Sequence, residues 1–389
     1  MELTDFEKKI IEENRDKDVR DLALKLHNKN INTTTVLQQI AGWQIAKHKI
    51  PDWANNKELL YPVHLSMEQC SSDFTAKYKA EVVTKLVKCQ KKMADLTGGF
   101  GIDFYYISQN FEKATYIETN SELCEIAEHN FKVLGRTNAV VKNGNGINIL
   151  EKSDEHLDLI FVDPARRDKD GGKTVHIKDC EPDVTEYQEM LKEKADIVMI
   201  KLSPMLDLKE CRQELKNIRE IHVVANNNEC KEMLLILDKN FDDEPNIFCV
   251  NNNQKLNFKT SEESSATACY ADKINNGMFL YEPNSAIMKG GAYKLLCNKY
   301  DVKKLQQSSH IYVSETEIND FPGRKFVIEE VGNVKIFKGL DKANVAVRNF
   351  PIKAEELKKK LKLKDGGDIY LFGTTLKDNQ KVIIKTRKI

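Results

Sequence analysis

The chain has 389 residues, of which 41% are hydrophobic and 31% charged, and this balance favours a folded protein of two or three domains over a long disordered chain. No apolar run reaches the roughly 18 residues that a membrane span needs, and the polar N-terminus lacks a signal-peptide core. We therefore expect a cytoplasmic protein with no membrane segment.

The net charge of zero hides a basic tail, because residues 331–389 carry 15 Lys and Arg against 6 Asp and Glu, a net of +9. Such a tail favours an anionic partner, although a solvated lysine-rich surface explains it equally well.

The nine cysteines are scattered along the chain without a Cys-x-x-Cys pair. None stands near a pair of histidines at the spacing of a zinc site. We expect thiols that are free or buried in a reducing compartment, and no metal site.

Residues 1–85 are predicted to form an N-terminal helical region, since their apolar residues recur at helical spacing. From residue 86 to 258 short apolar runs alternate with helical stretches, which is typical of a doubly wound, mostly parallel α/β sheet. The predicted strands are 93–95, 114–118, 139–141, 157–163, 197–200 and 221–224, and the predicted helices are 121–134, 184–193 and 229–237.

The remaining residues are predicted to form two small α+β domains, at 259–318 and 319–389. The first contains a helix over 286–296 after the turn at Tyr281-Glu282-Pro283-Asn284. The second contains one basic helix and short strands. The strands are expected at 326–328, 334–337, 369–372 and 381–384, and the helix at 354–361.

A glycine-rich loop, 95–103, follows the first strand of the alternating region and precedes a helix. Glycines in such a loop allow the backbone to approach a bound cofactor closely. Glu118 ends the next apolar run, where a carboxylate suits the hydroxyls of a ribose. Together the loop and the acid predict a nucleotide cofactor. The alternative is that the loop is an ordinary glycine turn and that Glu118 stands at the end of its strand by chance.

The loop begins with an acid, Asp95, which would repel a pyrophosphate but suits a cofactor that carries an ammonium and a sulfonium. The loop resembles that of the class I methyltransferases, which bind S-adenosylmethionine, with Thr97 in place of their first glycine. The resemblance implies that Asp95, Thr97, Gly99, Phe100 and Gly101 hold the methionine end of the cofactor. It also places Glu118 at the ribose.

Asn145 follows the third strand, in Asn143-Gly144-Asn145-Gly146, at a position where this family places an adenine-binding residue. The resemblance therefore implies that its side-chain amide addresses the adenine. A turn residue after a strand is the competing explanation.

Asp163-Pro164-Ala165-Arg166 ends the fourth strand, where enzymes of this family that methylate exocyclic amines carry their catalytic motif. The resemblance implies that Asp163 and the Pro164 carbonyl accept protons from the substrate and that Asp163 also borders the cofactor. Arg166 replaces the usual aromatic residue, and a guanidinium can stack on a base or bind phosphate. The atom that is methylated is left open.

Asp-Pro-Ala-Arg also resembles the uracil-5-methyltransferases, which use a cysteine just after the fifth strand. That place reads Lys201-Leu202-Ser203 here, and Cys211 lies well beyond it and is predicted to be a core residue.

Upstream, the segment 71–79 either closes over the cofactor or is a capped helix start, with Phe74 and Tyr78 as an i,i+4 pair.

Over most of its length the chain resembles a bacterial family with a class I methyltransferase domain, a ferredoxin-like domain and a C-terminal THUMP-like domain. The motifs that carry this resemblance are 281–284, 321–324 and 347–351. THUMP domains bind RNA, so the resemblance implies a methyltransferase acting on a base in ribosomal or transfer RNA. The alternatives are a non-catalytic RNA-binding protein with a degenerate methyltransferase domain, and a small-molecule or protein methyltransferase. The oligomeric state is not predicted.

Overall fold

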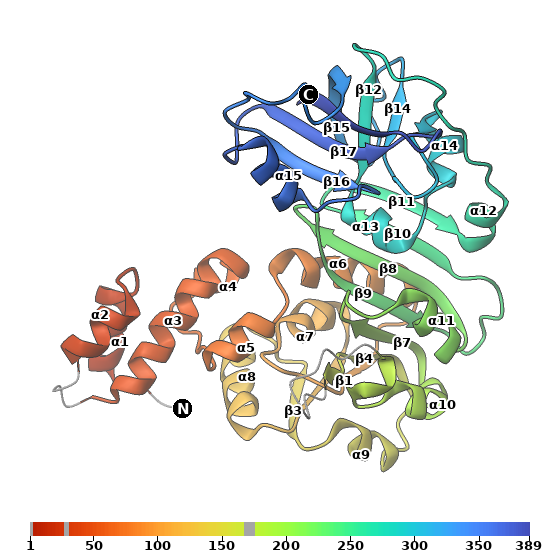
Figure 1. Cartoon of the computed structure of the whole chain (residues 1–389). Coiled ribbons are helices and arrows are strands. Elements are labelled where there is room, and N and C mark those ends of the chain that lie inside the picture. The colour runs from red at the N-terminus through yellow and green to blue at the C-terminus, as the bar shows by residue number, and fades with distance from the viewer. Residues whose placement is uncertain (1–2, 27–30, 167–175) are drawn as a thin grey trace. The chain divides into compact units, whose positions relative to one another are not determined.

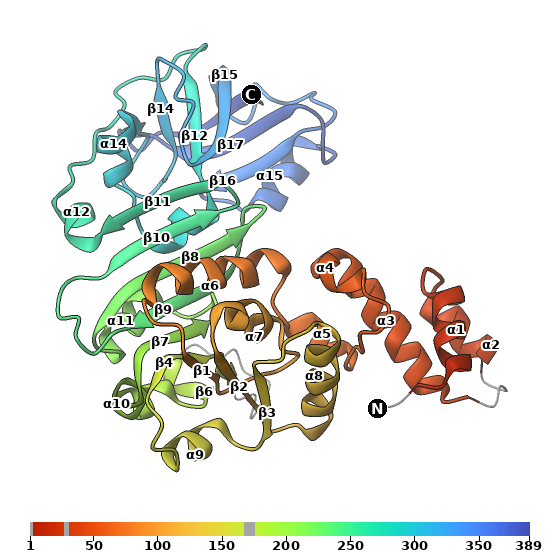
Figure 2. The same cartoon turned by 180° about the vertical axis from the view of Figure 1, so that it is seen from behind.

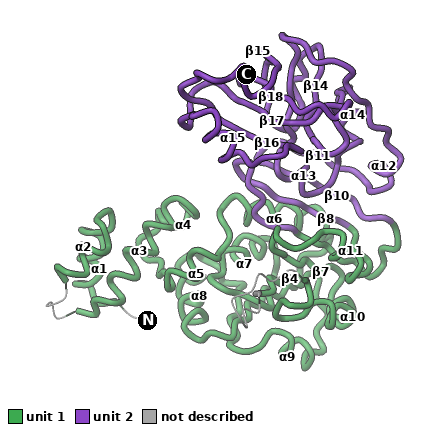
Figure 3. The backbone as a smooth tube through the Cα atoms, viewed as in Figure 1, with its two compact units in different colours: residues 1–219, 234–243 green, residues 220–233, 244–389 purple. Residues whose placement is uncertain are grey.

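A computed structural model describes residues 3–26, 31–166 and 176–389 of the chain (Figure 1). The chain divides into two compact units, residues 1–219 with 234–243 and residues 220–233 with 244–389 (Figure 3). Among the described residues, no helix combines the length and the apolar character that crossing a bilayer requires.

The first unit begins with helices, as predicted. Thr4 and Glu7 form a capping box at the start of α1, because each side chain accepts a hydrogen bond from the backbone of the other residue. The first three helices enclose a small apolar core of Ile10, Leu22, Leu26, Val36 and Ile40. The helices of this region are α1 (Asp5–Asn14), α2 (Val19–Leu26), α3 (Thr33–Lys49), α4 (Pro51–Ala54), α5 (His64–Gln69) and α6 (Asp73–Leu86).

Five parallel strands of the first unit stand in the order β7-β4-β1-β2-β3. The chain order reverses between β1 and β4, and ligands bind at such a switch point in sheets of this kind. The strands are β1 (Lys92–Asp95), β2 (Lys113–Glu118), β3 (Ala139–Asn143), β4 (Leu157–Val162) and β7 (Ala195–Leu202). The predicted α/β class is confirmed.

Helices and short strands connect these five strands. α8 packs on β2 and β3, and α10 packs on β7, as Figures 1 and 2 show. The connecting elements are α7 (Ile102–Ile107), α8 (Ser121–Val133), α9 (Gly146–Glu151), β5 (Ala165–Arg166), β6 (Cys180–Glu181), α10 (Val184–Lys194) and α11 (Leu208–Glu214), with short 3-10 turns at Ser108–Asn110 and Ile177–Asp179.

The predicted helix at 229–237 is wrong, because this segment is the strand β9 (Glu229–Leu237), which follows β8 (Ile218–Asn226). Asn227 and Asn228 join the two strands with positive φ angles of 52° and 63°, as a two-residue hairpin turn requires. The end of β9 is a continuous buried apolar run, which periodicity cannot assign to helix or strand. The division between the two units passes through this hairpin.

In the second unit, β10 (Asn246–Asn251) runs parallel to β8, and β11 (Gln254–Lys259) pairs antiparallel with β10. The short helix α12 (Thr260–Ser265) follows. The predicted helix 286–296 is interrupted, because α13 (Ser285–Gly290) ends at Gly291, whose φ of 86° is left-handed, and α14 (Leu295–Tyr300) starts anew.

A seven-stranded sheet completes the second unit, in the order β13-β14-β12-β15-β18-β17-β16. Its elements are β12 (Phe279–Pro283), β13 (Lys303–Lys304), β14 (Tyr312–Ser314), β15 (Gly323–Gly332), β16 (Asn344–Arg348), α15 (Ala354–Leu361), β17 (Ile369–Thr375) and β18 (Lys381–Lys388). The strand predicted at 334–337 is a turn instead, because the Asn333 side chain accepts a hydrogen bond from the Lys335 amide at 2.9 Å and ends β15.

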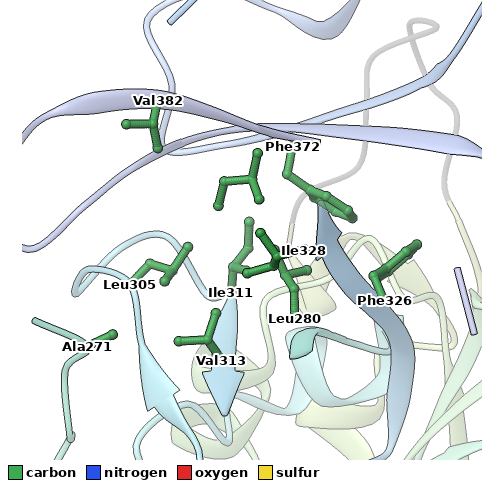
Figure 4. Packing of buried hydrophobic residues seen from close by; sticks show 10 residues of the cluster. Ala271, Leu280, Leu305, Ile311, Val313, Phe326, Ile328, Phe372 and Val382 are labelled. Carbon is green, nitrogen blue, oxygen red and sulfur yellow. The ribbon is translucent and has the colours of Figure 1, made fainter. Parts of the chain in front are cut away.

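Each face of this sheet carries a buried apolar cluster. Neighbouring residues on β17, Leu371 and Phe372, belong to different apolar clusters, as the alternation of side chains along a strand dictates. Helix α15 covers the face of Leu371 through Leu357 and Leu361. The other cluster, drawn in Figure 4, consists of Ala271, Leu280, Leu305, Ile311, Val313, Phe326, Ile328, Phe372, Val382 and Ile384.

Candidate functional site

The glycine-rich loop connects β1 to α7 and needs its glycines for two separate reasons. A Cβ atom at Gly98 would lie 2.2 Å from the ring of Tyr116, so no side chain fits there. Gly99 and Gly101 have φ angles of 56° and 86°, in the left-handed region. The backbone of this loop therefore takes a path that few other sequences allow.

The side chain of Phe100 belongs to the core. It is 3% exposed and packs edge-on against Trp53, with ring centroids 5.2 Å apart, and it lies near Tyr61. Any contact of Phe100 with a cofactor would therefore be made by its backbone. Its ring joins the glycine loop to the segment that follows α3.

Asp95, the last residue of β1, is 1% exposed and only half satisfied. Its Oδ1 accepts a hydrogen bond from the Thr97 amide at 2.9 Å, whereas its Oδ2 is buried and has no partner among the described residues. Burial raises the pKa of Asp95 well above its ordinary value, and the nearby carboxylates of Asp103, Asp163 and Glu118 raise it further. A buried acceptor without a donor is costly, and it is suited to a ligand that brings a donor or a positive charge.

Thr97 and Glu118 fix the loop to its neighbouring strands. The Thr97 hydroxyl accepts a hydrogen bond from the Asp163 amide at 2.7 Å, which joins the loop to the end of β4. Glu118, at the end of β2, accepts hydrogen bonds from the Gly99 amide at 2.8 Å and from the Asn120 amide at 2.9 Å. The predicted residues of the loop, of β2 and of β4 therefore meet at one place.

Asn145 is the N-cap of α9, where its side-chain oxygen accepts a hydrogen bond from the Asn148 amide at 3.0 Å. This is a local structural role, although it is a helix cap and not the turn residue that the sequence offered as the alternative to adenine binding. The residue is exposed. Its contact with an adenine stays a prediction.

Asp163 follows β4 and makes an ion pair that the sequence did not reveal. Its Oδ2 lies 2.6 Å from the Nζ atom of Lys201, which is near the end of β7. Lys201 also lies 3.4 Å from Asp103, at the start of α7. Asp103 in turn lies 3.2 Å from Lys79 of α6 and accepts a hydrogen bond from the Ser71 hydroxyl at 2.8 Å.

These residues form an ionic chain, Lys79, Asp103, Lys201 and Asp163, in which the charges alternate. Burial alone would raise the pKa of Asp103, but the charges of Lys79 and Lys201 and the Ser71 hydroxyl outweigh it and lower the pKa. The only sign of this ionic chain in the sequence was the place of Lys201, directly after the apolar run of the fifth parallel strand.

Pro164 and Arg166, the other predicted catalytic residues, follow Asp163 along the chain. Pro164 is buried. The backbone of Arg166 belongs to the short strand β5, which pairs with β6, but its side chain lies outside what the structure describes. Cys211 is 1% exposed on α11, which confirms it as a core residue. Among the described residues, no group of His, Cys, Asp or Glu side chains is arranged to hold a metal ion.

The segment at 71–79 contains a capped helix start. The Ser72 hydroxyl accepts a hydrogen bond from the Thr75 amide at 3.4 Å and caps α6. On either side of this cap, Ser71 and Lys79 contact Asp103. The segment therefore contributes to the ionic chain, and its movement over a cofactor stays a hypothesis.

In the second unit, the three family motifs meet at a buried carboxylate. Glu282 is 3% exposed and accepts hydrogen bonds from Arg324, through Nε at 2.8 Å and through Nη2, and from Arg348 at 2.9 Å. The Asn284 amide donates to the Pro322 carbonyl at 3.1 Å. We call Glu282, Arg324 and Arg348 the arginine fork.

The basic tail places three consecutive lysines on α15. Lys358 makes ion pairs with Asp365 at 2.6 Å and Glu355 at 3.1 Å, so its charge is balanced within the domain. Lys359 and Lys360 are exposed. These two lysines are available for a partner.

Comparisons with known proteins agree with this architecture. Residues 279–322 match a family model of a ferredoxin-like domain, and residues 323–388 match a THUMP-like domain. No curated protein matches the chain at a significant level. The crystal structure of a candidate methyltransferase from Porphyromonas gingivalis W83 is 33% identical, with a TM-score of 0.87, and the match covers 100% of both chains.

Two further solved structures match part of the chain. An rRNA methylase from Streptococcus thermophilus is 12% identical over 42% of this chain and 94% of its own, with a TM-score of 0.33. TrmK from M. capricolum, in complex with S-adenosylhomocysteine, is 15% identical over 42% of this chain and 69% of its own, also with a TM-score of 0.33. These scores are too low to support a functional comparison.

The full-length match and the two domain models lead to one assignment. The chain belongs to the class I methyltransferase family of the Porphyromonas gingivalis protein, with a ferredoxin-like and a THUMP-like domain in its C-terminal part.

Proposed function

We propose that this protein is an S-adenosylmethionine-dependent methyltransferase that acts on a base in structured RNA, ribosomal or transfer, in the cytoplasm. The observation that carries the proposal is the buried Oδ2 atom of Asp95, which has no partner among the described residues and lies beside a glycine turn. Such an acceptor favours a ligand with positive charge, and a dinucleotide with its pyrophosphate is disfavoured.

The residues around the loop fit the cofactor. Asp95, Thr97 and the backbone of residues 99–101 would hold its methionine end, since the ammonium and the sulfonium both suit acidic surroundings. Glu118, whose carboxylate already meets the Gly99 amide, would accept hydrogen bonds from the ribose hydroxyls. Asn145 would address the adenine from the start of α9. When bound, the cofactor would supply an electrophilic methyl group.

Asp163 and Pro164 would act on the methyl acceptor. Asp163 directly follows β4, the strand next to β1, and its side chain is 38% exposed, so a substrate can reach its carboxylate. This carboxylate and the Pro164 carbonyl can accept hydrogen bonds from an amino group and orient its lone pair. Arg166, which follows in the same segment, would stack on the base or bind a phosphate.

The RNA part of the proposal depends on the second unit. Its THUMP-like domain and its net charge of +9 over residues 331–389 suit the phosphate backbone. Two other functions compete with this one. A non-catalytic RNA-binding protein would share the basic domain, and a small-molecule or protein methyltransferase would share the glycine loop.

Two experiments separate these functions. In calorimetry, the purified protein should bind S-adenosylmethionine or S-adenosylhomocysteine at micromolar level and NAD far more weakly. Binding of NAD alone would overturn the cofactor assignment. Mass spectrometry of RNA nucleosides from a deletion strain should show one methylated nucleoside missing. An unchanged set would favour a small-molecule or protein methyltransferase if the protein binds S-adenosylmethionine, and the non-catalytic binder if it does not.

A further inference from the structure

Lys201 is held between two carboxylates at the end of β7. Its Nζ atom lies 2.6 Å from Asp163 Oδ2 and 3.4 Å from Asp103 Oδ2, and its side chain is only 13% exposed. A lysine side chain usually keeps its ammonium group in water, because removing the charge from water is costly. Its enclosure here indicates that the two carboxylates compensate for the lost water.

The inner end of the ionic chain is fixed more firmly than the outer end. Lys79 is fully buried, Asp103 is 11% exposed, and both contact the Ser71 hydroxyl, at 3.3 Å and 2.8 Å. Asp163, at the outer end, is 38% exposed. The ionic chain therefore leads from a buried ion pair to Asp163, whose carboxylate a substrate can reach.

Asp163 is held twice, once by its backbone and once by its side chain. Its amide donates to the Thr97 hydroxyl at 2.7 Å, and its carboxylate accepts from Lys201 at 2.6 Å. The first contact fixes where the side chain begins, and the second fixes the direction of its carboxylate. A carboxylate that must meet an acceptor group in one orientation needs both contacts.

We propose that Lys201 is a positioning residue, which orients the Asp163 carboxylate toward the methyl acceptor and is itself held by Asp103, the ion-pair partner of Lys79. The inference rests on the proposed function. Lys201 acts through Asp163 and has no separate task in the reaction. Its removal should therefore matter only when Asp163 is present.

A double-mutant cycle tests this dependence. Lys201→Met should lower kcat for RNA methylation about 100-fold, the cost of a misplaced reacting group, while the Kd for S-adenosylhomocysteine in calorimetry stays within about threefold. In an Asp163→Asn background, the same change should lower kcat by less than about threefold. Lys201→Arg, which can still donate to both carboxylates, should retain kcat within about tenfold.

Lys194→Met is the matched control. Lys194, at the end of α10, donates to the Ser153 carbonyl and lies outside the ionic chain. The kcat of the Lys194→Met variant should therefore equal that of the wild type. The melting temperature of each variant gives a readout besides activity. If Lys201→Met does not fold, Lys201→Leu, which also removes the donor, takes its place in the cycle.

The outcomes distinguish the inference from the function on which it rests. The positioning role alone would be overturned if the losses of kcat from the two single variants multiplied in the double variant. It would also be overturned if the Kd for S-adenosylhomocysteine rose together with the loss of kcat. A wild-type protein that binds the cofactor product but methylates no RNA would overturn the proposed function, and the inference with it.

Discussion

Two buried carboxylates, one in each unit, have opposite surroundings. Glu282 is 3% exposed, and both of its oxygens are bonded to the guanidinium groups of the arginine fork. Asp95 is 1% exposed, and its Oδ2 has no partner among the described residues. A fully paired buried carboxylate is part of the architecture, whereas an incompletely paired one at a sheet switch point is available to a ligand.

The largest effect on activity is expected at Asp163. Its carboxylate lies between these two cases, because it is paired with Lys201 and still partly exposed. Asp163→Ala should lower methyl transfer about 1,000-fold or more, because it removes an acceptor and part of the positioning of the substrate. Initial rates on RNA that lacks the modification measure this loss. Cofactor binding and the melting temperature should change little.

Cys211→Ser is the control for Asp163→Ala. Its thiol is buried on α11, so the activity of the folded variant should be nearly that of the wild type. An inactive Cys211→Ser together with an active Asp163→Ala would favour covalent attack on a ring carbon instead.

Breaking the arginine fork should be the largest stability effect. Glu282→Gln leaves two guanidinium groups beside a buried amide, and we expect a loss of about 3 kcal/mol in the free energy of unfolding of the second unit. Urea denaturation followed by fluorescence measures it. Glu330→Gln, at an exposed position of β15, should change the free energy by less than about 0.5 kcal/mol. Equal effects of the two variants would contradict an architectural role for Glu282.

Substitution of Asp95 should change the free energy of unfolding in the opposite direction from substitution of Glu282. Burial raises the pKa of Asp95 in the folded protein, so its charged form costs stability, and this cost grows as the pH rises above the pKa of an unfolded aspartate. Asp95→Asn should therefore raise the free energy of unfolding by about 1 kcal/mol at pH 7, and the gain should shrink as the pH falls toward about 4.

The same variant should weaken binding of S-adenosylmethionine at least tenfold, since a carboxylate that pairs with a cation is lost. Thermal melts between pH 4 and 8, together with calorimetry, test both parts. Asp154→Asn, an exposed neighbour of β4, serves as the control. A variant that is destabilised at pH 7 would show that Asp95 is paired in the protein.

The smallest effect is expected on α15. Lys359→Gln with Lys360→Gln should weaken RNA binding a few-fold and reduce the salt dependence of the Kd by about one unit of slope per lost phosphate contact. Lys85→Gln with Lys88→Gln, exposed lysines of the first unit, should leave the slope unchanged. The reverse result would place the RNA on the first unit.

Local patterns in the sequence predicted the parallel strands, the glycine loop and the acid at the end of β2. The strand β9 was missed because a continuous apolar run has no period, although its preceding asparagines were the signal of a hairpin. The ionic chain could not be predicted, because Lys201 meets Asp163 and Asp103 across 38 and 98 residues of sequence. Only the fold brings such charges together.

The seven-stranded sheet has a consequence for how the C-terminal part can be dissected. β12, in the ferredoxin-like domain, pairs with β15, in the THUMP-like domain, and the cluster in Figure 4 takes residues from both. Cutting the chain between residues 322 and 323 would leave β12 with an open edge of unpaired amides and carbonyls, which invites pairing with other molecules. We expect the amide protons of β12 and β15 to exchange with solvent at the same slow rate, because the two domains open as a single cooperative unit.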